Sequence, residues 1–194
     1  MNQSLNMNWL AGKRKQAKTK YLPLMDVEAI KKVRDFHKTL DQYSVTPLQS
    51  LPHLAAKFNV GGIYVKDESS RFGLNSFKAL GSTYALSKIM NEMTVSSNTP
   101  LTFYATTDGN HGRAVAWAAA KLGHKSIIYM PKGSPEVKLE NIRREGGEAY
   151  ITDMNYDDTI RYTAALAEKT PGGIIVQDTA WENYTDIPGW IMQG

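Results

Sequence analysis

One lysine of this sequence occupies an unusual position for a solvated charge. Lys78 lies in the segment Ser76-Phe77-Lys78-Ala79-Leu80-Gly81, and apolar residues at helical spacing predict that a helix begins there. The positive end of the helix dipole disfavours a cation at this point but tolerates a neutral amine or an imine. Lys78 is therefore a candidate reacting group, against the alternative that it is one more solvated lysine on a surface helix.

A second candidate site is the segment Thr106-Thr107-Asp108-Gly109-Asn110-His111-Gly112, which joins a predicted strand to a predicted helix. Ligands bind at the carboxyl ends of the strands in open parallel sheets. Free helix amides, reached through Gly109 and Gly112, suit a carboxylate or a phosphate. The segment has neither the lysine of a Walker loop nor the spacing G-x-G-x-x-G. An ordinary strand-to-helix turn is the alternative.

Other chemistries have weaker support. Ser76 and Lys78 have the spacing of a serine–lysine hydrolase pair, but no oxyanion loop accompanies them. The four histidines lack the spacing of metal ligands, so we expect no metal site. The sequence contains no cysteine, which excludes disulfides, zinc–thiolate sites and thiol catalysis.

Strands and helices are predicted to alternate along most of the chain. We expect strands at residues 62–66, 101–105, 125–130, 149–152 and 172–176, and helices at 26–40, 52–58, 76–93, 110–122, 134–145 and 155–169. Asp26 and Asn155 are predicted helix caps, and Ser134-Pro135 predicts a cap followed by proline at the first helical position. This alternation is typical of an α/β fold with a parallel sheet covered by helices.

Composition sets the broad class of the protein. The chain has 194 residues, of which 42% are hydrophobic and 22% charged, as in an ordinary soluble globular protein. Its net charge of +4 derives largely from a basic run at Lys13, Arg14, Lys15, Lys18 and Lys20, which we interpret as a solvated leader and not as a nucleic-acid or lipid contact. Neither a signal peptide nor a membrane span is evident, so we expect a cytoplasmic protein without nucleic-acid or membrane partners.

Three segments together resemble a known group of enzymes. Lys66-Asp67-Glu68-Ser69, Asn75-Ser76-Phe77-Lys78 and Asp108-Gly109-Asn110-His111-Gly112 resemble the pyridoxal-phosphate enzymes of fold type II, the tryptophan synthase β fold. Within this group, Phe72-Gly73-Leu74-Asn75, the aspartate before Gly109, and Gln177-Asp178-Thr179-Ala180-Trp181-Glu182 are most similar to the diaminopropionate ammonia-lyase family. The resemblance runs from about residue 43 to the end and implies open, mostly parallel sheets covered by helices.

The resemblance implies roles for individual residues. Lys78 matches the lysine that holds pyridoxal 5'-phosphate as a Schiff base, with Phe77 beside it, and Asn110 matches the residue that hydrogen-bonds the ring hydroxyl of the cofactor. The amino-acid substrate would bind through its α-carboxylate to the loop formed by Thr107, Asp108, Gly109, His111 and Gly112. Asp178 matches a further catalytic acid that meets the distal amino group of the substrate. A carboxylate that caps the turn at 179–181 is the alternative.

Asp108 narrows the implied substrate. An anion a few ångströms from the substrate carboxylate is unfavourable by about 1 kcal/mol or more, but a second ammonium group on the substrate would reverse that balance. In the resembled family this aspartate is a second base, so both D- and L-2,3-diaminopropionate would be substrates. Lys78 or Asp108 would remove the Cα proton in an α,β-elimination that yields pyruvate and ammonia. A threonine or serine dehydratase, or a threonine synthase-like enzyme, is the alternative.

The resemblance also implies that part of the family's sequence is missing. No Gly-Gly-Gly-x-Gly phosphate loop occurs, residues 94–100 make a short connection, and residues 187–194 predict a helix that stops soon after it begins. We expect residues 1–79 to be the start of a large cofactor domain, 80–170 a complete small domain, and 171–194 the truncated return to the large domain, whose sheet would expose apolar surface. The full-length protein is expected to be a homodimer. A catalytically inactive remnant is the alternative for this chain.

Overall fold

A four-stranded parallel sheet forms the centre of the molecule. The computed structural model describes residues 25–92 and 101–194. The strands follow the order β5-β4-β3-β6. They are β3 (Thr102–Thr106), β4 (Lys125–Met130), β5 (Glu148–Ile151) and β6 (Gly173–Ile175). All three pairings are parallel, which confirms the predicted α/β class.

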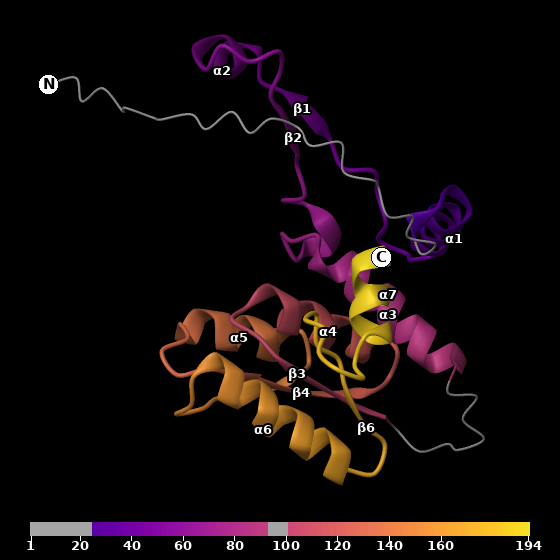
Figure 1. Ribbon diagram of the computed structural model, residues 1–194, viewed down its shortest axis with the longest axis vertical. Coiled ribbons are helices and arrows are strands. Elements are labelled where there is room, and N and C mark those ends of the chain that lie inside the picture. Colours follow the sequence, from indigo (N-terminus) through magenta and orange to yellow (C-terminus); the bar gives the residue numbers. More distant parts are fainter. Residues whose placement is uncertain (1–24, 93–100) are drawn as a thin grey trace, which may run out of the picture.

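Helices cover both faces of this sheet. The crossovers are α4 (Asn110–Lys121), α5 (Glu136–Arg144) and α6 (Tyr156–Lys169). Figure 1 shows α4 and α5 on one face and α6 on the other, so that the sheet is the middle of three layers. Phe103, Val115 and Ile128 are fully buried between the layers. Every residue of β3 is buried, as expected for a central parallel strand with helices on both sides.

Gly112 determines how closely α4 approaches the sheet. A Cβ atom at this position would lie 2.4 Å from Cγ2 of Thr107 and 2.6 Å from Cγ2 of Ile128. Only glycine therefore permits the observed contact between the first turn of α4 and strands β3 and β4. The close contact places the start of α4 at the carboxyl end of β3.

The helix that begins at Lys78 packs against the helix at the end of the chain. These are α3 (Lys78–Glu92) and α7 (Asp186–Gln193), which lie side by side in Figure 1. A Cβ atom at Gly81 would lie 2.3 Å from the backbone oxygen of Ile191, so the two backbones come into direct contact there. This contact brings the final helix beside the first turn of α3.

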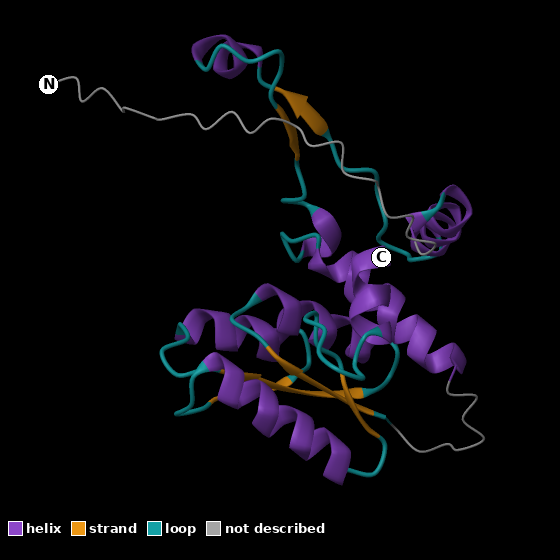
Figure 2. Cartoon of the chain, viewed as in Figure 1, coloured by secondary structure: helices purple, strands orange, loops and turns teal. Residues whose placement is uncertain are grey.

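The part of the chain before α3 projects from this body. It contains α1 (Val27–Lys38), β1 (Leu48–Ser50), α2 (Pro52–Lys57) and β2 (Tyr64–Lys66). Asp26 caps α1, as predicted, by accepting a hydrogen bond from the Ala29 amide at 2.7 Å. The segment from β1 to β2 forms an arm that extends away from the sheet (Figures 1 and 2).

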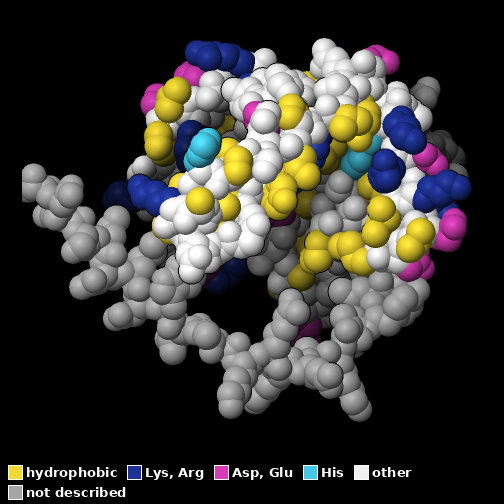
Figure 3. Space-filling model, turned by 90° about the horizontal axis from the view of Figure 1, so that it is seen from above, with side chains coloured by type: hydrophobic (Ala, Val, Ile, Leu, Met, Phe, Trp, Pro, Cys, Tyr) yellow, Lys and Arg dark blue, Asp and Glu magenta, His cyan; other side chains and the backbone are white. Residues whose placement is uncertain are grey.

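The arm exposes apolar side chains. Leu48, Tyr64 and Val65 are all exposed, and Figure 3 shows many hydrophobic side chains on this side of the molecule. Strands β1 and β2 pair in antiparallel fashion, unlike the strands of the central sheet. The connection at residues 51–63, which contains α2, reverses the chain between the two strands.

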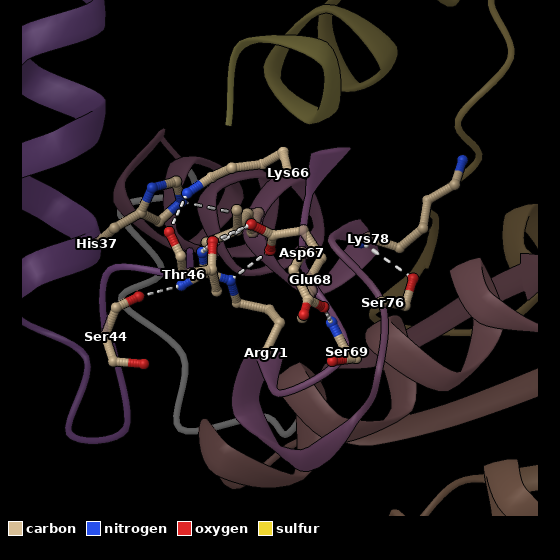
Figure 4. Close-up of polar contacts among 12 residues, drawn as sticks. His37, Ser44, Thr46, Lys66, Asp67, Glu68, Ser69, Arg71, Ser76 and Lys78 are labelled. Atoms are coloured by element: carbon tan, nitrogen blue, oxygen red, sulfur yellow. Dashed lines mark hydrogen bonds and ion pairs between the residues drawn. The ribbon is translucent and has the colours of Figure 1, made fainter. Parts of the chain in front are cut away.

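A polar network holds the base of the arm together (Figure 4). The short 3-10 helix η2 (Arg71–Gly73) supplies Arg71, which is 4% exposed. Its guanidinium donates to Glu68 Oε2 at 2.6 Å and to the Ser44 carbonyl at 2.7 Å. Thr46 donates its hydroxyl hydrogen to the same carboxylate. The segment from Lys66 to Ser69 on which the family resemblance partly depends thus has a structural role here.

One predicted helix start is wrong in detail. Ser134-Pro135 was expected to supply a cap and then a proline at the first helical position, but α5 begins at Glu136 and Pro135 itself is the N-cap. The Ser134 hydroxyl donates to the Pro131 carbonyl at 2.8 Å and so stabilises the preceding turn instead. Asn155 caps α6 as predicted, accepting from the Asp158 amide at 2.9 Å.

Other expectations concern residues outside the described chain, the domain boundaries and membrane-spanning helices. The basic run at residues 13–20 and the connection at 94–100 lie outside the described residues. The proposed domain boundaries stay predictions, although β6 lies beyond the boundary at residue 170 and pairs with β3 in the central sheet. Within the described residues no helix has the length and apolar character needed to cross a bilayer.

Candidate active site

Lys78 is the first residue of α3, as the apolar periodicity predicts. Its amide donates to the Ser76 hydroxyl oxygen at 3.3 Å, and its side chain extends away from the Arg71 network (Figure 4). Its ammonium group donates to Asp178 Oδ2 at 2.7 Å. The helix start was expected to favour a neutral amine, but the structure supplies a countercharge from a residue 100 positions away.

The Lys78 side chain lines a pocket of about 450 Å³ between α3, α7 and the segment after β6. Its lining residues are Phe77, Lys78, Leu80, Gly81, Asp178, Pro188, Ile191, Met192 and Gly194. Lys78 and Asp178 are the only charged side chains in that set, and most of the wall is apolar. The pocket therefore places one amine and one carboxylate against a largely apolar wall, partly open to solvent.

The Asp178 side chain is 19% exposed and directly follows Gln177 at the end of the β6 segment. Burial acts to raise its pKa, but positive charge and hydrogen bonding outweigh burial, and the pKa of Asp178 lies below its usual value. The groups that lower it are His111 and then Lys78, which donates the 2.7 Å hydrogen bond. The contact to Lys78 favours the active-site interpretation of Asp178 over the turn-capping alternative.

His111 lies behind Asp178 in the first turn of α4 and is 4% exposed. Its Nε2 atom is 2.8 Å from the Val176 carbonyl oxygen. Its Nδ1 atom is buried without a hydrogen-bond partner and lies 3.9 Å from Asp178 Oδ2. Burial lowers the pKa of His111 despite the opposing influence of Asp178. The ring is accordingly neutral near pH 7.

The loop after β3 brings together most of the predicted substrate-binding residues. Thr107 is buried and its hydroxyl oxygen accepts from the Gly109 amide at 2.9 Å. That amide is therefore already engaged and cannot also bind a ligand. The next three amides, those of Asn110, His111 and Gly112, have no partner within the described chain. They point from the N-terminus of α4, where the helix dipole favours an anion.

Asp108 and Asn110 have exposed side chains on this loop. Lys138, in the first turn of α5, donates to the Asp108 carbonyl oxygen at 2.8 Å. The stem of Lys138 also passes over Gly109, 3.1 Å from the place a Cβ atom would occupy. The Lys138 ammonium thus lies at the backbone of this loop, where its positive charge favours a bound anion.

Sequence reasoning missed two polar residues that connect these loops. Gln177 is fully buried; its oxygen accepts from the Thr106 amide at 3.0 Å and its nitrogen donates to the Tyr156 hydroxyl at 3.2 Å. Burial, followed by the carboxylates of Asp178 and Asp108, raises the pKa of Tyr156. Gln177 belongs to the segment that carries the family resemblance, but nothing in the sequence assigns it a contact, and for Tyr156 the only signal is its position at the start of a predicted helix.

Comparison with known proteins identifies relatives of this arrangement. Residues 39–192 match the family described as pyridoxal-phosphate dependent enzyme. A diaminopropionate ammonia-lyase of Salmonella typhimurium is 47% identical over 190 residues, which cover 89% of this chain and 47% of the relative. An L-threonine dehydratase of Haemophilus influenzae is 33% identical over 114 residues, covering 59% of this chain and 21% of that protein.

A solved structure agrees with the sequence relatives. The crystal structure of Escherichia coli diaminopropionate ammonia lyase in complex with an aminoacrylate-PLP azomethine reaction intermediate has a TM-score of 0.84 and 49% identity. The match covers 90% of this chain and 47% of that chain. The present chain therefore spans about half the length of the relatives it matches.

Proposed function

This chain belongs to the pyridoxal-phosphate-dependent enzyme family, and on that premise we propose that the protein eliminates ammonia from D- and L-2,3-diaminopropionate. One diaminopropionate and one water give one pyruvate and two ammonia molecules. The observation that carries the proposal is the Lys78 amine, which lies 2.7 Å from Asp178 in an apolar pocket beside the carboxyl ends of the parallel strands. The 47% identity to the Salmonella typhimurium ammonia-lyase supports the choice of substrate.

The residues around Lys78 fit the cofactor of the family. The amine faces a pocket of about 450 Å³, Phe77 contributes an apolar wall, and the exposed amide of Asn110 is available to the ring hydroxyl. When bound, pyridoxal phosphate supplies an aldehyde that reacts with amines and a ring that stabilises negative charge at the substrate Cα. Lys78 would hold the cofactor through its amine, and the same amine would move the proton at the substrate Cα.

Two carboxylates suit a substrate that carries two amino groups. Asp178 lies at the pocket and would meet the distal ammonium group of the substrate. Asp108 would act as the base for the D-isomer and Lys78 as the base for the L-isomer, because the two stereoisomers present the Cα proton to opposite sides. A crystal structure of the Escherichia coli enzyme in complex with D-serine, 47% identical to this chain, supports access of D-amino acids to such a site.

The start of α4 would hold the substrate α-carboxylate. Three unpartnered amides and the helix dipole favour an anion there, and Thr107 orders the loop by accepting from the Gly109 amide. The role of Gly112 in this arrangement is steric: it permits the close packing that positions the amides. Lys138 adds a positive charge beside the same loop.

We also propose how the chain is divided into domains and how the protein assembles. Residues 80–170 would constitute the small domain, flanked by two parts of a large domain at 1–79 and 171–194, in a cytoplasmic homodimer. Light scattering of the longest natural form of the protein tests the dimer, and limited proteolysis tests the domain boundaries.

Turnover tests the proposed reaction. The chain is incubated with pyridoxal phosphate and D- or L-2,3-diaminopropionate, and pyruvate is measured with a coupled dehydrogenase. We expect pyruvate from both isomers and much less from serine or threonine. Greater release from serine or threonine would instead assign a dehydratase activity. No pyruvate from any of these amino acids would refute catalysis by this chain.

A further inference from the structure

Three groups from separate parts of the fold meet beside the pocket. Lys78 comes from the start of α3, Asp178 from the segment after β6, and His111 from the first turn of α4. Asp178 Oδ2 is 2.7 Å from the lysine Nζ and 3.9 Å from the histidine Nδ1. A single carboxylate oxygen thus faces both an amine and an imidazole nitrogen.

The hydrogen bond on the far side of the ring determines which nitrogen of His111 carries hydrogen. The Val176 carbonyl can only accept, so Nε2, 2.8 Å away, must be the protonated nitrogen. In the neutral ring Nδ1 therefore presents a lone pair toward the carboxylate of Asp178. Two acceptors face each other without a proton between them, which explains why Nδ1 is buried without a partner.

We propose that Lys78, Asp178 and His111 form one proton-transfer unit, in which His111 accepts the proton that Lys78 loses. The bond between Lys78 Nζ and hydrogen breaks, the Asp178 carboxylate carries the proton across, and a bond between His111 Nδ1 and hydrogen forms. The net charge of the unit stays the same. Asp178 gains a hydrogen bond from the imidazolium ring when it loses the one from the ammonium group.

Burial opposes a charge on His111, and the Asp178 carboxylate is the group that would stabilise it, so the transfer leaves Asp178 facing a cation. Without a nearby cation, a carboxylate that is 19% exposed would remain charged in an apolar pocket, at considerable cost in desolvation. Nδ1 is the nearest vacant proton acceptor, and the 3.9 Å separation exceeds an ordinary hydrogen bond by about 1 Å, which a side-chain rotation covers. The other titratable groups that interact with Asp178 are Tyr156 and Tyr184, with Asp108 across Tyr156, and none of them offers a positive charge.

This inference rests on the proposed function, because amine chemistry at Lys78 requires its neutral form. The transfer would produce that nucleophile and retain the proton nearby for the departing ammonia. His111 would then be a positioning and proton-holding residue, beyond the backbone contribution of its loop to substrate binding. A histidine that only anchors the Val176 carbonyl would still feel the charge of Lys78 through space, but that response would not depend on Asp178.

Nitrogen NMR of the histidine side chains tests the unit without cofactor or substrate. In the 194-residue chain we expect His111 as the neutral tautomer with hydrogen on Nε2 near pH 7, its signals assigned by their loss in His111→Gln. In Lys78→Met the ammonium is absent, and the pKa of His111 should rise, with Nδ1 becoming protonated. An unchanged His111 titration in folded Lys78→Met would overturn the proposal.

Further variants separate a specific effect of Lys78 on the His111 titration from a general change in the structure. Lys88 also lies on α3 and pairs with a carboxylate, and its side chain is 34% exposed against 33% for Lys78, so Lys88→Met is a matched control that should leave His111 unchanged. Lys78→Arg retains the cation and should restore the wild-type titration. The effect of Lys78→Met should be much smaller when it is measured against Asp178→Asn than against the wild type; an equal rise in the two backgrounds would contradict a relay through Asp178.

The experiment also separates this inference from the proposed enzyme. Lack of pyruvate release together with the expected NMR response would overturn the ammonia-lyase activity and leave the proton-transfer unit standing. Pyruvate release together with a His111 titration that is unchanged in Lys78→Met would support the ammonia-lyase activity and overturn the proton-transfer unit.

Discussion

Replacing Gly112 with alanine perturbs the candidate site through a single methyl group. The new Cβ would lie 2.4 Å from Cγ2 of Thr107 and 2.6 Å from Cγ2 of Ile128. Both neighbours are buried β-branched side chains with few alternative rotamers. The first turn of α4 must therefore move away from the sheet by about 1 Å to regain ordinary contact distances.

The expected destabilisation follows from two opposing terms. Overpacking of a well-packed core costs about 1–3 kcal/mol, and the rigidity of both neighbours places Gly112→Ala near the upper end of that range. Alanine is favoured over glycine within a helix by about 1 kcal/mol, which offsets part of the cost. The net loss is about 2 kcal/mol, equivalent to a fall in Tm of about 4–8 °C for a chain of this size.

Thermal unfolding followed by circular dichroism measures this effect, with Gly189→Ala as the control. Gly189 is also in a helix, α7, and no heavy atom lies within 4 Å of the place its Cβ would occupy. Gly189→Ala should stabilise the chain by about 0.5–1 kcal/mol, since it only removes backbone freedom. If the protein is a lyase, a shift of α4 by about 1 Å should also lower kcat/KM by about 100-fold.

The reasoning is refuted if Gly112→Ala unfolds at or above the wild-type temperature. An equal fall in Gly189→Ala would also refute it, because open space around Gly189 cannot produce overpacking.

Three other predictions follow from the structure. Asp108→Asn should abolish pyruvate release from the D-isomer and preserve release from the L-isomer, and equal loss of both isomers in coupled assays would contradict a two-base site. Arg71→Met should cost about 3–5 kcal/mol in urea unfolding, because it leaves Glu68 partly buried without its cation, whereas Arg161→Met, at an exposed pair, should leave the urea midpoint unchanged. Burial lowers the pKa of His111 in the folded state below its usual 6.5, so the unfolded chain binds more protons and stability should fall as the pH drops through about 6.5. In His111→Gln this part of the pH dependence should be absent from urea midpoints measured between pH 7 and pH 5.

The sequence predicts the parallel sheet well because its signals are local. Short apolar runs alternate with helical patterns, and the helix caps at Asp26 and Asn155 depend on contacts within three residues. The position of Lys78 at a helix start is likewise a local property. Such features can be predicted from the sequence because they do not depend on how distant segments pack.

The contacts that complete the site are not local. The partners Lys78 and Asp178 are separated by 100 residues, and Gln177 reaches Tyr156 across 21 residues. Their proximity depends on the insertion of β3 between β4 and β6, an order that periodicity does not determine. The family resemblance selects Asp178 as a candidate, but the burial of His111 and the hydrogen bonds of Gln177 depend on how distant segments pack.

Covalent labelling of Lys78 is the most direct test of the central claim that its amine reacts with pyridoxal phosphate. The chain is mixed with the cofactor, reduced with borohydride, digested, and mapped by mass spectrometry. Lys88 serves as the internal comparison, since it is on the same helix, is similarly exposed and is also paired with a carboxylate. We predict stoichiometric label on Lys78 and little on Lys88. Equal labelling of the two lysines, or no label on Lys78, would contradict the account.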